Sequence, residues 1–75
     1  MGILRGISGR EAIKRFSKLG YVVVGQNGSH VRLRHSINSI QHRSLTIPMK
    51  KELKIGLLHQ LIQDAGSNVK DFLEL

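Results

Sequence analysis

Apolar residues at helical spacing predict an amphipathic helix near the start of the chain. Between residues 12 and 19 they recur every three or four positions and so form one stripe. Ser8 and Glu11 have the spacing of a capping box, in which Ser8 accepts a backbone N–H and Glu11 reaches back to the N-cap N–H. Gly20 suits the left-handed residue that ends a helix. We therefore expect a helix over residues 9–19.

The middle of the chain has the shorter period of β-strands. Residues 21–26 are rich in β-branched side chains, and residues 29–35 alternate between apolar and polar positions. Between them, Asn27-Gly28 is the dipeptide most typical of a two-residue hairpin turn. A polar loop separates the second strand from a third over residues 43–47, which Pro48 ends because proline cannot donate to the ladder.

The last third of the chain returns to helical spacing. An apolar stripe between residues 58 and 65 predicts a second helix, with Gly66 as its C-terminal glycine. Asn68 followed by Asp71 can cap a short last helix. Residues 1–7 show no periodicity, and we expect them to be a short lead-in.

The elements together predict an α+β fold of order α-β-β-β-α in a single domain, residues 1–75. A three-stranded antiparallel sheet has one face to bury, and the two amphipathic helices can cover it. The short C-terminal helix completes the domain. The other face of the sheet is left to solvent or to a partner.

Composition narrows the function of this domain. The chain has 75 residues and a formal net charge of +7, from 12 Lys and Arg against five Asp and Glu. Such a charge favours a polyanion, whether nucleic acid, an anionic membrane surface or an acidic protein, although solubility alone also explains it. The lack of cysteine excludes a disulfide framework and a thiolate metal site. A small secreted fold usually needs disulfides, so we expect a cytoplasmic protein. No N-terminal apolar stretch resembles a signal peptide, and no run is long enough to span a bilayer.

One face of the second strand carries the candidate chemistry. If Val31 and Leu33 point to the helices, then His30, Arg32 and Arg34 share the open face. Alternate strand residues lie about 6.5–7 Å apart, close to the repeat of phosphates along a nucleic-acid strand, and guanidinium groups bind phosphate oxygens. Histidine transfers protons near neutral pH, as RNA cleavage through the ribose 2′-hydroxyl requires. Solvated positions on an amphipathic strand are the alternative interpretation.

The remaining basic residues are weaker candidates. His35 falls on the inward face, and His42 and His59 lie near the third strand and on the second helix. No histidine pair with a carboxylate has the spacing of a zinc site, so we expect no metal and no other cofactor. Lys50 and Lys51 either extend a phosphate-binding surface or form a solvated linker.

A series of short motifs runs through the chain. They are Leu19-Gly20-Tyr21, Gly28-Ser29-His30, Thr46-Ile47-Pro48, the segments 52–56 and 64–66, and a tail over residues 69–73. In this order they resemble the HicA-like (YcfA-like) family of toxins from toxin–antitoxin pairs, over residues 8–75.

The resemblance implies a fold like that of double-stranded-RNA-binding domains and cleavage of mRNA that halts translation, with no metal. It also implies neutralisation by a HicB-like antitoxin, contact with DNA only indirectly through that antitoxin, and no contact with a membrane. The family's active histidine lies in its Gly-Ser/Thr-His motif, which falls on His30. We therefore assign His30 as catalytic, and the residues assigned to RNA or phosphate binding are Ser29, Arg32, Arg34, Lys50 and Lys51.

The chain departs from the family's pattern in places. Many relatives have a second histidine where this chain has Val31, and another after the proline, where it has Met49 and Lys50. The usual threonine after the helix glycine is Leu57. The second proton-transfer group is therefore unassigned, with Lys50 and Arg43 as candidates.

Two other functions fit the same features. A non-catalytic RNA-binding module of this fold explains the charge and the order of elements. An adaptor for a protein partner is the other, because alternation leaves either Val22 and Val24 or Tyr21 and Val23 outward as an apolar patch. If an antitoxin exists, we expect it to cover His30 or the face of Arg32 and Arg34.

Overall fold

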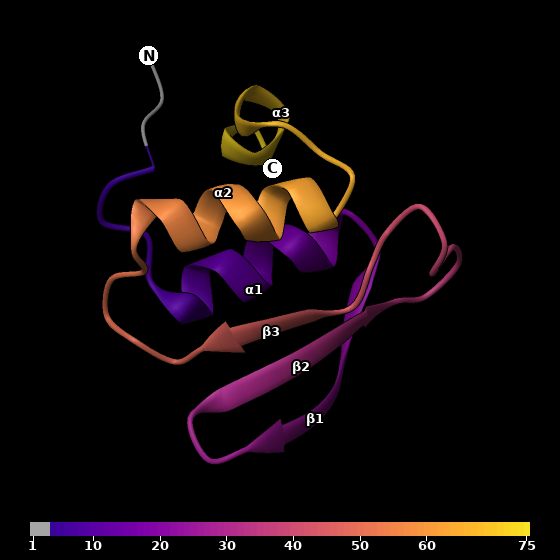
Figure 1. The fold of residues 1–75 in the computed structure, drawn as a ribbon, viewed down its shortest axis with the longest axis horizontal. Coiled ribbons are helices and arrows are strands. Elements are labelled where there is room, and N and C mark those ends of the chain that lie inside the picture. Colours follow the sequence, from indigo (N-terminus) through magenta and orange to yellow (C-terminus); the bar gives the residue numbers. More distant parts are fainter. Residues whose placement is uncertain (1–3) are drawn as a thin grey trace.

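Three helices and three strands make up residues 4–75, the part of the chain that the structure, a computed structural model, describes. In chain order they are α1 (Gly9–Lys18), β1 (Tyr21–Asn27), β2 (His30–His35), β3 (Leu45–Pro48), α2 (Ile55–Asp64) and α3 (Val69–Leu73). The strands form one antiparallel sheet in the order β1-β2-β3, and the helices lie on one side of it (Figure 1). The expected α+β fold, like that of double-stranded-RNA-binding domains, is confirmed.

Helix α1 begins and ends where its flanking residues predict. Ser8 Oγ accepts a hydrogen bond from Glu11 N over 3.0 Å, and Gly20 has a φ of +111° just beyond the C-cap. The expected return contact from Glu11 to the N-cap N–H is wrong. Its carboxylate instead accepts from Arg15 Nε one turn along the helix, over 3.0 Å.

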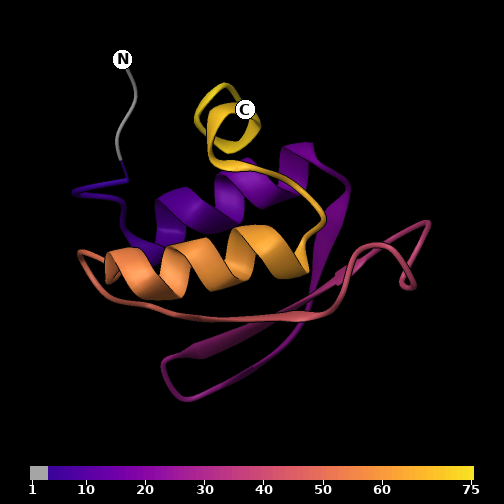
Figure 2. The same ribbon diagram turned by 45° about the horizontal axis from the view of Figure 1, so that its top comes forward.

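The start of α1 lies directly on the end of β3. A Cβ atom at Gly9 would stand 2.2 Å from the carbonyl oxygen of Pro48, and Gly9 N donates to Lys50 O over 2.9 Å. The missing side chain therefore allows the helix and the chain after β3 to approach each other. This approach places the first turn of α1 at the same end of the sheet as the hairpin between β1 and β2 (Figure 2).

The core lies between the sheet and the helices. The inward residues of β2 and β3 pack under two phenylalanines, Phe16 of α1 and Phe72 of α3, whose ring centroids are 5.0 Å apart. Leu4 and Ile7 are also buried, so the lead-in expected over residues 1–7 packs on the core from residue 4 onward. Their segment has no regular period because it follows the core surface without forming a helix or strand. The part of that expectation that concerns residues 1–3 lies outside the described residues.

The strand boundaries differ from the prediction by one or two residues. Asn27 pairs with His30, so the hairpin turn is Gly28-Ser29 and not Asn27-Gly28. Gly28 supplies the positive φ, +63°, that the first turn residue requires. The third strand begins at Leu45 because Arg43 N donates to Asp64 O, at the end of α2. Pro48 is the last residue of the strand.

A bulge in β1 changes which residues face outward. The register of β1 against β2 shifts between Val23 and Gly25. Val22, Val23 and Val24 are about half exposed, at 48%, 55% and 52%. The strict alternation expected for this strand is therefore wrong, because the bulge adds a residue and because β1 is an edge strand.

The C-terminal helix is fixed to α1 through one side chain. Asn68 Oδ1 caps α3 by accepting from Asp71 N, as the sequence predicts. Arg15 then donates to the backbone oxygens of Phe72 and Leu73 over 3.1 and 2.9 Å. The short helix thereby closes the core on the side away from the sheet.

Candidate functional site

His30 is the first residue of β2, at the tip of the hairpin. It pairs with Asn27 on β1 and with Pro48 on β3. Met49 N donates to Ser29 O over 2.7 Å, which holds the chain after β3 beside the turn. The imidazole is exposed, and neither ring nitrogen makes a hydrogen bond within residues 4–75. Both nitrogens are therefore available to a substrate.

Two guanidinium groups share the open face of β2 with this imidazole. Arg32 and Arg34 are exposed, whereas Val31 and Leu33 between them are 4% and 0% exposed. The predicted alternation is confirmed. Along the same face, Thr46 of β3 lies opposite Arg32, so the cationic side chains have only uncharged cross-strand neighbours on β3.

A shallow basic hollow lies at the same end of the sheet as His30. Lys50 and Lys51, both exposed, come directly after β3, and Arg10 projects from the first turn of α1. The residues that line the hollow are Ser8, Arg10, Met49, Lys50 and Lys51. Sequence reasoning missed Arg10. The available signal was a cation in the first turn of a helix, where the helix dipole disfavours positive charge.

The charge distribution separates the sheet from the rest of the molecule. All five acidic residues lie outside residues 12–51, a stretch that holds eight of the 12 Lys and Arg residues. The three strands and the loops between them therefore contain no carboxylate side chain. A polyanion that approaches the open face of the sheet meets cations and no opposing charge, an asymmetry that the net charge alone does not reveal.

His35 and His42 form a stacked pair at the other end of the sheet. Their ring centroids are 4.0 Å apart, with 22° between the planes. His35 Nδ1 accepts from the backbone N–H groups of Ile37 and Asn38, so its proton lies on Nε2, which donates to Leu19 O over 2.9 Å. His42 donates from Nδ1 to the C-cap carbonyl of α2. These contacts give both rings a structural role.

Tyr21 and Arg43 also belong to that far end. The Tyr21 hydroxyl donates to Arg43 O over 2.6 Å, and burial of the ring, together with the charge of Asp64, raises the pKa of Tyr21 to about 12. Tyr21 pairs with His35 across the strands, whereas His30 lies at the opposite end of β2. The structure thus separates Arg43 from His30, whereas Lys50 lies at the His30 end of the sheet, two residues after Pro48, the cross-strand partner of His30.

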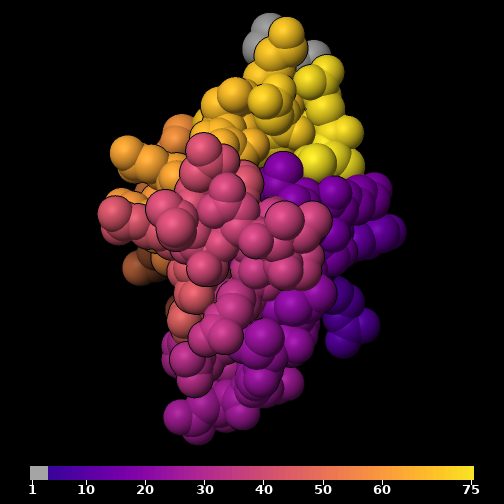
Figure 3. Space-filling model, turned by 90° about the vertical axis from the view of Figure 1, so that its right-hand side faces the viewer, coloured from indigo at the N-terminus to yellow at the C-terminus, as the bar shows by residue number. Residues whose placement is uncertain are grey.

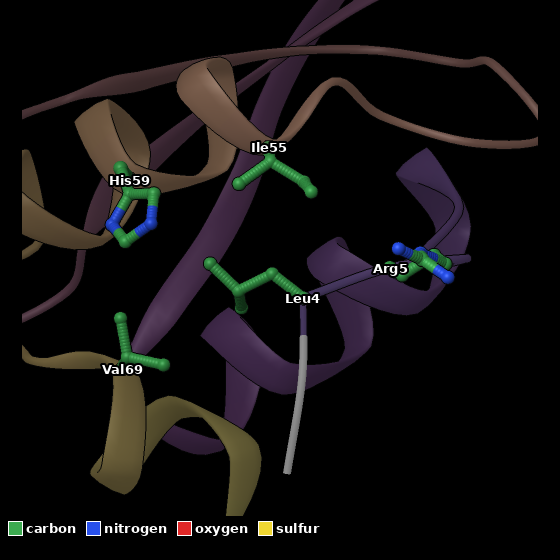
Figure 4. A pocket seen from close by; sticks show the side chains of 5 residues that line it. All are labelled: Leu4, Arg5, Ile55, His59 and Val69. Carbon is green, nitrogen blue, oxygen red and sulfur yellow. The ribbon is translucent and has the colours of Figure 1, made fainter.

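The fourth histidine lies on the helical side of the molecule. His59 of α2 borders an apolar cavity of about 300 Å³, with Arg5 at its edge (Figure 4). The other residues that line this cavity are Leu4, Ile55 and Val69. No carboxylate belongs to this lining, and the helices separate it from the open face of the sheet. The cavity therefore lies apart from the face of the sheet that carries His30, Arg32 and Arg34.

Two broader findings concern residues 4–75. No three His, Cys, Asp or Glu side chains within this part of the chain gather as ligands for a metal ion. Over the same range, each helix is too short or too polar to cross a membrane.

Comparisons with known proteins bear on this site. A family model described as "HicA toxin of bacterial toxin-antitoxin" matches residues 9–67. The matched stretch runs from the first residue of α1 to just beyond α2 and includes the whole sheet with His30. Comparisons with curated proteins and with solved structures gave no match.

Proposed function

This chain belongs to the HicA toxin family of bacterial toxin–antitoxin systems, and from that premise we propose that it is an endoribonuclease. It cleaves mRNA in the cytoplasm without a metal ion, arrests translation, and is neutralised by a HicB-like antitoxin. His30 is the catalytic residue, and the residues that bind RNA are Ser29, Arg32, Arg34, Lys50 and Lys51. The observation that carries this proposal is the exposed His30 ring, with both nitrogens unoccupied, beside two guanidiniums on a sheet without carboxylates.

The arrangement suits cleavage of RNA by its own ribose. His30 removes the proton of a 2′-hydroxyl, and the 2′-oxygen forms a bond to phosphorus while the bond from phosphorus to the 5′-oxygen breaks. The 5′-oxygen takes up a proton, so the products are a 2′,3′-cyclic phosphate and a 5′-hydroxyl. Arg32 stabilises the additional negative charge on the pentavalent phosphorus centre, and Arg34 holds the next phosphate along β2.

A second proton-transfer group completes the reaction. Lys50 follows Met49, whose backbone N–H is hydrogen-bonded to Ser29 O. The backbone of Lys50 therefore lies at the His30 end of the sheet. As a cation, its side chain can donate a proton to the departing 5′-oxygen. Lys50 is therefore the general acid of this proposal.

The decisive experiment compares two exposed histidines. We expect His30→Ala to lower the rate of RNA cleavage by roughly 10²–10⁴-fold, the usual contribution of a general base. The protein is purified free of contaminating nucleases and assayed with EDTA present. His59→Ala removes another exposed imidazole, on α2, and serves as the matched control, with a cleavage rate expected to equal that of the wild type.

The same assay separates the alternatives. A folded His30→Ala protein that cleaves RNA as fast as the wild type would end the catalytic assignment. Wild-type protein that binds RNA with steep salt dependence but does not cleave it would identify a non-catalytic RNA-binding module.

A further inference from the structure

The loop between β2 and β3 exposes two isoleucines almost completely. Ile37 and Ile40 are 89% and 90% exposed, far more than any other large apolar residue among those described. We call residues 36–44 the isoleucine loop. Exposure of two aliphatic side chains to water on one loop is unfavourable in free energy. Such exposed apolar residues are typical of surfaces that become buried on binding.

The isoleucine loop is held in one conformation by hydrogen bonds. Asn38 Oδ1 accepts from the backbone N–H groups of Ile40 and Gln41, both over 3.1 Å. His35 Nδ1 accepts from Ile37 N and Asn38 N at the start of the loop. The backbone on either side of both isoleucines is therefore fixed before any partner arrives, which lowers the entropic cost of binding.

The surroundings of the loop specify the chemistry of its partner. Branched aliphatic side chains do not stack on bases, so they suit an apolar protein pocket better than RNA. Arg43 within the loop and Arg34 beside it are exposed, and no acidic residue lies between residues 12 and 51. Charge complementarity thus calls for a pocket with Asp and Glu at its rim. Figure 3 views the molecule from this end, where the loop covers the centre of the face and β1 lies below it.

We propose that the isoleucine loop is the anchor for the antitoxin, a protein with an apolar pocket bordered by carboxylates that receives Ile37 and Ile40. This inference rests on the toxin–antitoxin pairing proposed above. The anchor lies at the end of the sheet opposite His30 (Figure 2). Val22, exposed on β1 opposite Arg34, is a further apolar side chain at this end of the sheet. The antitoxin binds there and reaches across the open face from that end.

The position of the anchor makes the inference testable separately from catalysis. The double variant Ile37→Ser/Ile40→Ser removes both apolar side chains without touching the RNA-binding residues. Its affinity for the HicB-like antitoxin, measured by calorimetry, is expected to fall by at least about 30-fold, as for an interface hot spot. Its RNA cleavage rate is expected to stay within twofold of the wild type, so cells that express both proteins lose protection.

Matched variants decide the interpretation. Ile55→Ser changes an exposed isoleucine on α2 and is expected to keep full affinity, as is the conservative Ile37→Leu/Ile40→Leu. Unchanged affinity of the double serine variant would overturn the inference. So would a loss of RNA cleavage, or self-association of the wild type that the variant loses while antitoxin binding remains. Because binding is measured without cleavage, failure of the His30 assignment leaves this result interpretable.

Discussion

The two ends of β2 each carry a histidine, and their environments are opposite. His30 stands exposed at the hairpin tip with both ring nitrogens free, whereas His35 is buried with both ring nitrogens hydrogen-bonded to the backbone. The two lie at opposite ends of a six-residue strand, so strand alternation turns them to opposite faces of the sheet. The imidazole of His30 is therefore a candidate catalytic group, whereas the imidazole of His35 stabilises the fold.

The surroundings of the two histidines extend this contrast. Around His30 lie exposed cations and a turn, which contribute little to the core. Around His35 lie Tyr21, with ring centroids 5.2 Å apart, and the stacked ring of His42. Stability is thus concentrated at one end of the strand and the proposed chemistry at the other, so substitutions at the two ends should affect different measurements.

The largest effect on stability is expected from His35→Ala. It removes the acceptor for two loop N–H groups, the donor to Leu19 O and the stacked partner of His42. We expect the free energy of unfolding in urea to fall by about 3 kcal/mol. His30→Ala is the matched change at the exposed end and should stay within about 0.5 kcal/mol of the wild type. Equal losses in both variants would remove the distinction between the two ends.

The fold follows from the sequence where the determining signals are local. The Ser8 cap, Gly20 and the Asn68 cap each act within a few residues of the helix end that they set, so those helices are predicted closely. The buried Leu4 and the bulge after Val23 were not predictable in this way. Both depend on how segments that are distant in the sequence pack together. The periodicity of the neighbouring residues does not predict such packing.

The candidate site divides along the same line. The shared face of His30, Arg32 and Arg34 follows from a period of two within one strand, and the structure has that face. Its place in the first turn of a helix marks Arg10 as unusual, but its position beside Lys50 depends on the contact of α1 with the chain after β3, about forty residues away. That contact requires the absence of a side chain at Gly9, a condition that no local pattern indicates.

Two glycines with positive φ sharpen the comparison between the ends. A Cβ atom at Gly20, φ +111°, would stand 2.6 Å from His35 Nε2, whereas one at Gly28, φ +63°, would meet no atom within 4 Å. We expect Gly20→Ala to lower the free energy of unfolding by about 2–3 kcal/mol, from strain and a clash together. Gly28→Ala carries the strain alone and should cost about 1 kcal/mol. Equal costs in thermal unfolding would show that the His35 ring yields to the new methyl group.

The last predicted effect is a pH dependence confined to the buried end. Burial, assisted by the charge of Asp64, raises the pKa of Tyr21 from its ordinary 10.0 to about 12. Between these values the folded protein keeps a proton that the unfolded chain releases, so stability is complete below pH 10 and is lost as the pH rises toward 12. From pH 9 to pH 12 the free energy of unfolding should fall by about 2 kcal/mol from this group alone.

Tyr21→Phe isolates this contribution, because the two proteins share every other side chain. The hydroxyl bond to Arg43 is lost in the variant at all pH values, so its stability is lower at neutral pH but falls less steeply in alkali. Urea unfolding of both proteins at several pH values gives the difference between the two slopes. If the free energies of unfolding of the two proteins fall in parallel with pH, Tyr21 ionises as freely as in water. Water would then reach the His35 end more easily than its packing implies.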